Sequence, residues 1–413
     1  MILFLFAASY PYDFAVEQTF LAEEVRILAK KFDRVILVPK LKRGNRLSIP
    51  AGVEVDTSFA ESFSSARQVR FGILSMFSRD FFEDIKNRLP KSLSFVYMRR
   101  LVSFLAGARL TQDWVQNWFL KNNIPDSSAV FYTFWFDDIS MGIGLAKNTH
   151  PNLRVVSRTH GYDLYEELYA LWPCRSKAIS LMDGLFADSD AGAEYLREKY
   201  PAFKDRYQTA LLGVRDPGAV ADPSMDGVLR IVSCSMLNPI KRIDLLLEGI
   251  ACAARRRIGQ KIEWWHFGEG EPREELIKRA ANEFPPNASA DFPGYKSQAD
   301  LIKNYIDNPV DVFVNVSSTE GTPVSIMEAV SCGIPVIAAA VGGNAEIVSE
   351  KNGFLLNENP TAEEIADALL KVCDQREEMQ RKRRASREVW LERYNETTNF
   401  EAFAQKLVEI RKR

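Results

Sequence analysis

Residues 319–348 read TEGTPVSIMEAVSCGIPVIAAAVGGNAEIV, and this stretch sets the expected fold of the whole chain. Thr322 has the side chain of a helix N-cap and Pro323 suits the first helical position, so a short helix is expected from there to Cys332. The wholly apolar run at 336–341 is typical of a parallel strand buried on both faces. The stretch therefore predicts a loop, a helix N-terminus, a strand and a glycine turn that expose backbone N–H groups together.

A helix N-terminus of this kind favours a phosphate group, because it combines free N–H donors with the positive end of the helix dipole. Glu320 precedes the predicted helix, and Glu328 lies inside it, eight positions later. A carboxylate at Glu320 can accept hydrogen bonds from sugar hydroxyls, and Glu328 is placed to meet a second polyol such as a ribose. Spacing alone fits equally well with a helix cap at Glu320 and a solvated helix face at Glu328.

The same stretch resembles the Glu-x7-Glu signature of retaining glycosyltransferases of family 4, also called glycosyl transferases group 1, of the bacterial surface-polysaccharide type. Here the signature runs from Glu320 to Glu328 in the wording EGTPVSIMEA, and the GIPVI and GGNAEIV that follow also fit that family. The resemblance implies the GT-B fold, with a donor phosphate at the helix N-terminus. The substrate-binding residues implied there are Gly321, Thr322, Pro323, Val324 and Glu328.

The composition excludes several other classes of protein. The chain has 413 residues, enough for two domains, and its net charge of −2 argues against nucleic acid as the main partner. Its five cysteines are scattered without CxxC spacing, so neither a zinc site nor a disulfide framework is expected, which suits a reducing cytoplasm. The start MILFLFAASY lacks a basic region and reads as a first strand, and no run reaches the ~18–20 apolar residues that span a bilayer.

The N-terminal half alternates predicted strands and helices, as in a doubly wound parallel sheet. Strands are predicted at 2–7, 34–38, 130–134, 154–159, 184–187 and 210–214, with helices at 19–31 and 190–200. In the resembling family, a glycine-rich loop after the first strand approaches the donor phosphate. Here Ala15 and Val16 occupy the corresponding positions while Glu17 keeps the acidic one, which speaks against phosphate contacts from this loop.

Residues 57–124 have a helical pattern and many aromatic side chains. The part at 62–124 contains ten Lys and Arg against four Asp and Glu, a net charge of +6. A basic face with interleaved aromatics suits an anionic membrane surface or a lipid-linked acceptor. A core helix with buried aromatics and solvated charges explains the same pattern.

His160 follows the strand predicted at 154–159, and ligands collect beyond the carboxyl ends of strands in open α/β sheets. The local sequence RTHGYD, which contains His160, resembles the family's histidine motif. This resemblance implies that His160 faces the donor sugar. A lone histidine is more often structural, and this interpretation is kept for His150 and His266.

The second domain is expected to open with a strand at 229–235, followed by MLNPIKRID. This resembles the family's GRL-x4-KGxD element, in which Lys241 matches the lysine that neutralises the donor diphosphate. Met236 stands where the family usually has arginine and Arg242 where it has glycine, so Arg242 is a candidate for the missing positive charge.

A glycine turn follows the strand predicted at 263–267. A dinucleotide fingerprint is poorly supported there, because Arg273 replaces its third glycine. The resembling family binds its nucleotide base nearby, which makes Gly268 and Tyr295 further candidates for substrate binding.

The predicted architecture is α/β, with two Rossmann-like doubly wound domains facing a cleft. The expected domains are an acceptor-side domain at 1–215, joined by a C-terminal helix at about 390–413, and a nucleotide-sugar-binding domain at 216–389. The predicted reaction moves a hexose from a UDP- or GDP-linked donor to an acceptor hydroxyl with retention, in exopolysaccharide, capsule or lipopolysaccharide biosynthesis.

The candidate catalytic residues are Glu320, His160 and Lys241. No metal or other cofactor is expected, because Lys241, Arg242 and the helix N-terminus can meet the charge of the leaving group. The acceptor is expected to be lipid-linked or a saccharide, and the protein cytoplasmic with peripheral contact at the inner membrane face. Two alternatives stay open: a nucleotide-sugar epimerase on the same fold, and a non-catalytic nucleotide-sugar or glycan-binding protein.

Overall fold

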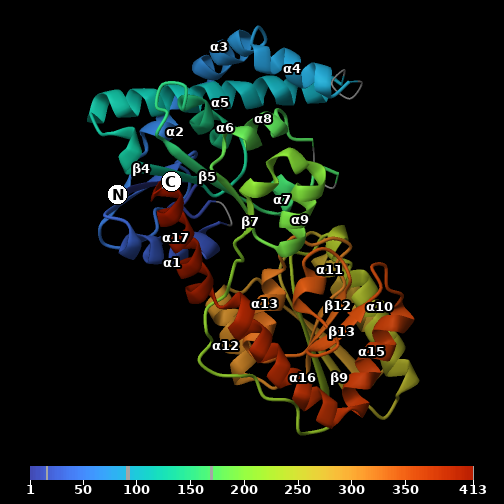
Figure 1. Ribbon diagram of the computed structural model, residues 1–413. Helices are drawn as coiled ribbons and strands as arrows, with labels where there is room; N and C mark the ends of the chain where they lie inside the picture. Colours follow the sequence, from blue (N-terminus) through green and yellow to red (C-terminus); the bar gives the residue numbers. More distant parts are fainter. Residues whose placement is uncertain (15–16, 90–93, 168–170, 413) are drawn as a thin grey trace. The chain divides into compact units, whose positions relative to one another are not determined.

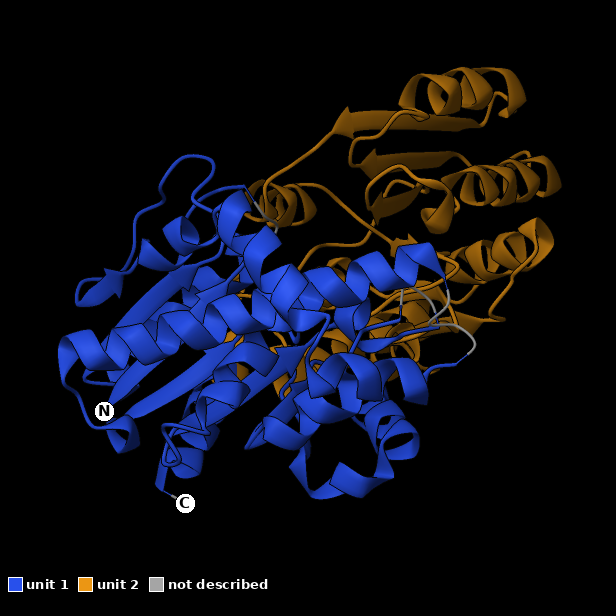
Figure 2. Cartoon of the chain, turned by 90° about the horizontal axis from the view of Figure 1, so that it is seen from above, with its two compact units in different colours: residues 1–211, 400–413 blue, residues 212–399 orange. Residues whose placement is uncertain are grey.

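The computed structural model describes residues 1–14, 17–89, 94–167 and 171–412, and the chain forms two compact units. Unit 1 comprises Met1–Leu211 and Phe400–Arg413, and unit 2 comprises Leu212–Asn399 (Figure 2). Each unit contains one parallel β-sheet with helices around it (Figure 1). The predicted pair of Rossmann-like parallel-sheet domains is confirmed.

Unit 1 has a seven-stranded parallel sheet in the order β3-β2-β1-β4-β5-β6-β7. Its strands are β1 (Ile2–Ala7), β2 (Arg34–Pro39), β3 (Val53–Val55), β4 (Ala129–Thr133), β5 (Arg154–Thr159), β6 (Gly184–Ala187) and β7 (Tyr207–Thr209). Its helices include α1 (Gln18–Lys31), α2 (Ser58–Ser62), α3 (Ser65–Ser75), α4 (Arg79–Asn87), α5 (Phe95–Asn122), α6 (Asp138–Ala146), α7 (Gly161–Leu164), α8 (Arg175–Leu181), α9 (Asp190–Lys199) and most of α17 (Glu396–Lys412).

The core of unit 1 follows from the alternation of side chains along its strands. Phe131 of β4 points to one face, where it stacks on Phe4 of β1 at 4.5 Å between ring centroids, and Phe4 meets Trp118 of α5 at 4.6 Å. The next residue, Tyr132, points to the other face and meets Phe403 of α17 at 5.1 Å. The chain's last helix therefore covers the sheet face opposite to α5.

Unit 2 has a six-stranded parallel sheet in the order β10-β9-β8-β11-β12-β13. Its strands are β8 (Leu229–Cys234), β9 (Ile262–Phe267), β10 (Ala288–Gly294), β11 (Val312–Asn315), β12 (Val336–Ala339) and β13 (Gly353–Leu356). Its helices include the 3-10 turn η4 (Pro239–Lys241), α10 (Ile243–Arg256), α11 (Arg273–Glu283), α12 (Gln298–Asp307), α13 (Val324–Ser331), α14 (Asn344–Ile347), α15 (Ala362–Asp374), α16 (Arg376–Val389) and the π turn η5 (Trp390–Tyr394).

The strand predicted at 210–214 is wrong, because β7 lies three residues earlier in the chain. Val214 instead packs against the last helices of unit 2. Its N–H donates to the carbonyl of Tyr394 at 2.9 Å, and its own carbonyl accepts from the indole of Trp390 at 3.1 Å. These bonds satisfy the backbone of Val214 outside any sheet.

Among the described residues, no helix combines the length and the apolar character needed to cross a membrane.

Candidate functional site

The strand order of unit 2 reverses between β8 and β11, which are paired neighbours with Ile231 opposite Val312. In open α/β sheets, ligands bind at such a switch point, beyond the carboxyl ends of the two strands. The loop after β8 carries Lys241 and the loop after β11 carries Glu320. The fold thus brings two of the predicted catalytic residues, 79 positions apart in the chain, to one place.

Glu320 is held by three donors that all point at its Oε1 atom. They are Lys241 Nζ at 2.7 Å, Asn315 Nδ2 at 3.0 Å and Ser317 Oγ at 2.6 Å. The side chain of Glu320 is 10% exposed, and its Oε2 atom accepts no hydrogen bond from any residue in the described ranges. The carboxylate is therefore fixed in orientation while one oxygen stays available for a hydroxyl group.

Lys241 ends the 3-10 turn η4, whose N-cap is Asn238. The Oδ1 atom of Asn238 accepts from the backbone N–H of Lys241 at 3.3 Å, which sets the direction of the turn. Across the switch point, the N–H of Ser318 donates to the carbonyl of Ile240 at 2.8 Å. Since an ammonium has three donors and Glu320 takes one, Lys241 can bind the carboxylate and an anionic ligand together.

Arg242 adopts a left-handed backbone conformation with φ +48°, which explains why a glycine suits this position in the resembling family. Its guanidinium donates to the carbonyls of Val316 at 2.5 Å, Ser317 at 2.6 Å and Glu358 at 3.0 Å, and to Asn359 Oδ1 at 3.2 Å. These bonds tie together the loops after β8, β11 and β13. They give Arg242 a structural role, and its predicted contact with a donor stays a prediction.

Helix α13 begins one residue later than predicted, because Pro323 is its N-cap and Thr322 lies in the preceding loop. Pro323 has φ −78° and ψ 93°, an extended conformation that no helical position accepts. Pro323 also has no side chain that could cap the helix, and the N–H groups of Val324 and Ser325 donate to no residue of the described chain. The N-terminus of α13 therefore keeps two free donors for an anion.

Two glycines after β12 allow the loops at this edge to approach closely. Gly342 has φ +47°, and a Cβ atom there would lie 1.9 Å from the carbonyl oxygen of Glu320. The N–H of Gly343 donates to the carbonyl of Gly321 at 2.9 Å. Gly343 is the N-cap of α14, and the buried Asn344 donates to the carbonyl of Ala339 at 3.0 Å.

Glu328 lies inside α13 and is 7% exposed, so it is not the solvated helix residue that spacing alone also allowed. The Nε2 atom of Gln298 donates to its Oε1 at 2.9 Å. Burial in an apolar helix face raises the pKa of Glu328 to about 7. Its carboxyl group is therefore about half protonated near neutral pH.

This raised pKa predicts a pH dependence of stability. Between the usual carboxyl pKa of 4.5 and about 7, the folded protein keeps a proton on Glu328 that the unfolded chain releases. Stability from this group is therefore lost as the pH rises through that window, by up to about 3 kcal/mol. Urea unfolding should show that the free energy of unfolding of the variant Glu328→Gln, relative to that of the wild type, rises from about pH 5 to pH 8. A difference that stays constant with pH would contradict this assignment.

The two other predicted residues of unit 2 lie beyond β9 and β10. Gly268 has φ +148°, and a Cβ atom there would lie 1.8 Å from the carbonyl oxygen of Ser235, so the close packing of the loops after β8 and β9 requires glycine. Tyr295 directly follows β10 and is 73% exposed. The nucleotide contacts predicted for both residues stay predictions.

In unit 1, His160 follows β5 at the carboxyl edge of the sheet and is 8% exposed. Its Nδ1 lies 3.0 Å from Asp188 Oδ2, and its Nε2 lies 3.1 Å from the carbonyl oxygen of Phe134. Both ring nitrogens thus lie within hydrogen-bond distance of an oxygen atom of unit 1. The ring is thus firmly positioned within unit 1, and its predicted contact with a sugar stays a prediction.

Glu17 fills the loop after β1 with its own carboxylate. This fully buried side chain accepts from the N–H groups of Ala8 at 3.0 Å, Ser9 at 2.5 Å and Tyr10 at 2.9 Å, and from Trp135 Nε1 at 2.7 Å. Three backbone N–H groups directly after β1 are therefore occupied by a carboxylate of the protein itself. Ala15 and Val16, which replace the family's glycines, lie outside the described residues.

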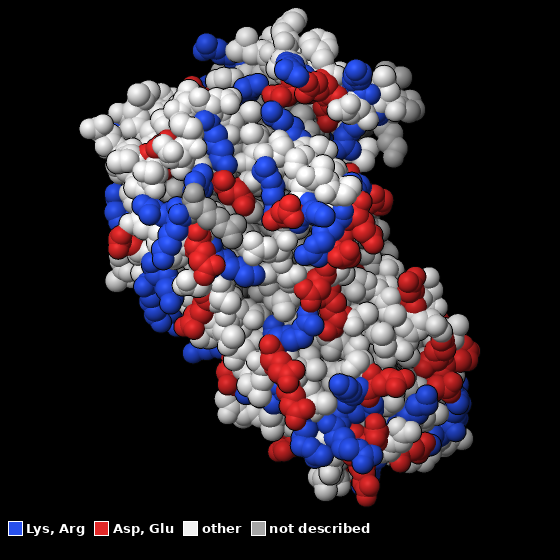
Figure 3. Space-filling model, viewed as in Figure 1, with Lys and Arg blue, Asp and Glu red and all other residues white. Residues whose placement is uncertain are grey.

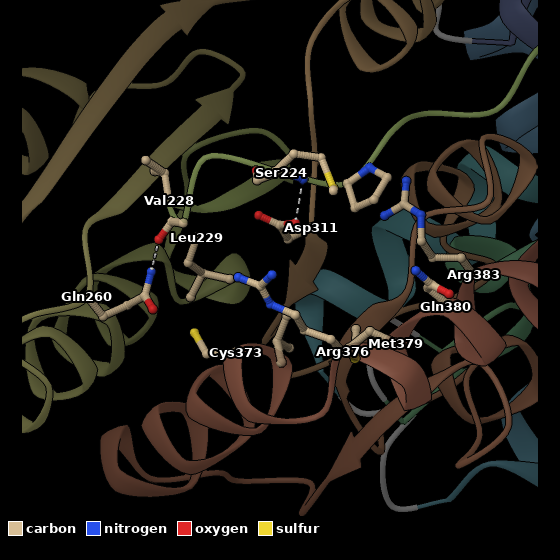
Figure 4. Close-up of a pocket in the computed structure, with 14 residues that line it drawn as sticks. Ser224, Val228, Leu229, Gln260, Asp311, Cys373, Arg376, Met379, Gln380 and Arg383 are labelled. Carbon is tan, nitrogen blue, oxygen red and sulfur yellow. Dashed lines mark hydrogen bonds between the residues drawn. The ribbon is translucent and has the colours of Figure 1, made fainter.

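A separate pocket of about 150 Å³ lies at the amino-terminal edge of the sheet in unit 2, between Ser224, Gln260 and Arg376 (Figure 4). Its carboxylate, Asp311, accepts from the backbone N–H groups of Ser224 at 2.9 Å and Arg230 at 2.8 Å. None of the predicted site residues lines this pocket. We therefore do not count this pocket among the candidate substrate sites.

Comparisons with known proteins show that the chain is similar to glycosyltransferases. Residues 224–389 match the family model of the glycosyl transferases group 1. The chain is 30% identical over 138 residues to the putative colanic acid biosynthesis glycosyltransferase WcaL of Escherichia coli K12, covering 32% of this chain and 33% of that protein. It is 29% identical over 150 residues to the amylovoran biosynthesis glycosyltransferase AmsK of Erwinia amylovora, covering 35% and 36%. The chain thus spans about a third of the length of these curated relatives.

Two solved structures are similar to the chain over nearly its full length. The lipopolysaccharide outer core galactosyltransferase WaaB in its apo form has a TM-score of 0.69 and 13% identity, covering 99% of both chains. HepE of Anabaena in complex with UDP and glucose has a TM-score of 0.62 and 16% identity, covering 99% of this chain and 100% of that one. At such low identity, the likeness establishes the fold alone.

Proposed function

We propose that this protein is a retaining glycosyltransferase of bacterial surface-polysaccharide biosynthesis, because residues 224–389 match the family model of the glycosyl transferases group 1 and the chain has the GT-B fold. It transfers a hexose from a nucleotide sugar to an acceptor hydroxyl. The names of WcaL and AmsK, which assign these proteins to colanic acid and amylovoran biosynthesis, support the biosynthetic setting. The UDP in the HepE complex supports a UDP-linked donor over a GDP-linked one.

The observation that carries this proposal is the pairing of Lys241 with Glu320 beside the uncapped N-terminus of α13. Lys241 and the free N–H groups of Val324 and Ser325 neutralise the diphosphate as its negative charge grows in the transition state. The Oε2 atom of Glu320 accepts a hydroxyl of the donor sugar and fixes its orientation. These groups supply the positive charge without a metal ion.

The transfer step breaks one bond, forms one bond and moves one proton, all between the two substrates. The bond from the anomeric carbon to the phosphate oxygen breaks, and the acceptor oxygen bonds to that carbon on the same face. The acceptor's proton passes to the leaving diphosphate.

The catalytic role of His160 belongs to the same proposal and rests on its RTHGYD motif. The acceptor is a saccharide or a lipid-linked group, and the protein is cytoplasmic, with peripheral contact to the membrane through residues 62–124.

A transfer assay tests the proposed function. Purified protein is incubated with UDP- and GDP-linked hexoses, with and without alkyl glycosides and a lipid extract as acceptors, and the released nucleotide is measured. We expect release from one class of donor that depends on the acceptor, and NMR of the product should show the anomeric configuration of the donor. Conversion of the donor sugar without acceptor would indicate an epimerase, and no turnover with any donor would indicate a binding protein.

A further inference from the structure

Helix α3 has the opposite amphipathicity to an ordinary surface helix. The residues that it buries are small, Gly72 and Ser75. A Cβ atom on Gly72 would lie 3.2 Å from Val102 of α5, so the two helices approach closely through this small face. Its large apolar side chains point away from the protein instead: Val69 is 63% exposed and Ile73 is 55% exposed.

The neighbouring segments add to this surface. Nine of the 21 exposed large hydrophobic residues of the described chain fall between positions 69 and 96, so they are not scattered singly over the molecule. Phe77 is 78% exposed and Phe95 is 81% exposed. In Figure 1, α3 and α4 lie along the outer side of α5. We call this surface the apolar face of unit 1; its residues are Val69, Ile73, Leu74, Met76, Phe77, Phe82, Leu89, Phe95 and Val96.

Basic residues lie among these apolar side chains. Arg70, Lys86 and Arg99 are exposed, and none of them forms an ion pair with another residue that the structure describes. Figure 3 shows blue and red side chains among uncharged atoms over α3 and α4. The bases therefore remain as available positive charge.

The acidic residues of α4, in contrast, are already satisfied. Asp80 pairs with Arg109 at 3.1 Å, and Glu83 pairs with Arg79 at 2.6 Å. Asp84 is buried and accepts from the N–H of Cys174 at 2.7 Å. Paired acids beside unpaired bases give the apolar face a net positive character.

We propose that the apolar face of unit 1 docks on an anionic lipid bilayer, with α3 lying in the interfacial region. Its apolar side chains enter the boundary between headgroups and acyl chains, while Arg70, Lys86 and Arg99 bind lipid phosphates. This combination fits a lipid surface better than a second copy of the chain, because two copies would bring their unpaired bases together. The inference deepens the membrane contact in the proposed function by naming the side chains, and it rests on unit 1 alone.

Sedimentation with lipid vesicles tests the docking surface. The full-length protein should bind vesicles of phosphatidylcholine with phosphatidylglycerol, bind pure phosphatidylcholine much more weakly, and dissociate as salt is added. The double variant Ile73→Ser/Phe77→Ser should lose at least about tenfold in partitioning. Lys86→Gln/Arg99→Gln should lose affinity for the anionic vesicles only. The matched control is Leu120→Ser, an 80% exposed leucine at the other end of α5, which should bind as the wild type does.

Nucleotide titration of each variant separates this inference from the proposed reaction, since unit 2 is unchanged in all of them. A variant that binds UDP as the wild type does but fails to sediment supports the docking surface. Equal binding to neutral and anionic vesicles, or wild-type binding by Ile73→Ser/Phe77→Ser, would overturn it. A dimer in light scattering that Ile73→Ser/Phe77→Ser dissociates would assign the face to a second copy and overturn it as well.

Discussion

The variant Glu320→Gln is expected to lose about 100-fold or more in turnover with its fold intact. Glutamine keeps the shape of the side chain, and its amide oxygen can still accept from Asn315 and Ser317. The negative charge that orients the donor sugar and pairs with Lys241 is lost. Steady-state kinetics with the active donor measure the effect, and the thermal midpoint reports the fold.

A suitable control for this variant is Glu350→Gln, which removes the charge of an exposed glutamate in the same unit. It should leave turnover unchanged. Turnover by Glu320→Gln within a few-fold of the wild type would remove Glu320 from the catalytic machinery. Equal losses in both variants would point to a general effect of charge on unit 2.

The variant Lys241→Ala is expected to weaken the binding of UDP by about 10- to 100-fold. An ammonium bonded to phosphate contributes about 1.5–3 kcal/mol, because the hydrogen bond is charge-assisted. Lys241 is well placed to supply it, since Glu320, at 2.7 Å, is the only acceptor that its three ammonium donors meet among the residues the structure describes. Titration calorimetry with UDP measures the loss.

Uridine provides the internal control for the lysine variant. It lacks the diphosphate, so its affinity should be the same for the wild type and Lys241→Ala. An equal loss for uridine and UDP would mean that the substitution disturbs the loop after β8 as a whole. Unchanged affinity for UDP would show that Lys241 does not contact the diphosphate.

The fold could be predicted from the sequence where strands lie in the middle of a sheet. The strands β1 and β5 are wholly or almost wholly buried, and the bounds of both were predicted to the residue. The strand predicted at 210–214 was misplaced relative to β7, and β3, β10 and β13 were not predicted; all four observed strands lie at the edges of the two sheets. Edge strands are half exposed, as the mixed burial along β10 shows, so their sequences lack the apolar run that identifies a central strand.

The candidate site shows the same division between local and distant information. The signature from Glu320 to Glu328 and the lysine motif predicted the pair that the fold brings together. Asn315 and Ser317, which orient Glu320, were not predicted, although a polar residue ending the apolar strand β11 was a usable signal.

The role of Glu17 could not be predicted from the residues near it in the sequence. Its bond to Trp135 joins residues 118 positions apart, and only the folded sheet brings them together. The sequence alone showed that the first loop lacks glycine. The structure adds that this carboxylate accepts from three backbone N–H groups directly after β1, those of Ala8, Ser9 and Tyr10.

The most direct test of the central claim is titration calorimetry of the purified protein with UDP, GDP and ADP, each with and without magnesium. We expect one nucleoside diphosphate, UDP in the first place, to bind clearly better than the other two, with the same affinity in the absence of magnesium. That result would support a donor site built from Lys241 and the N-terminus of α13. Binding of none of the three, or binding only with magnesium, would contradict the account.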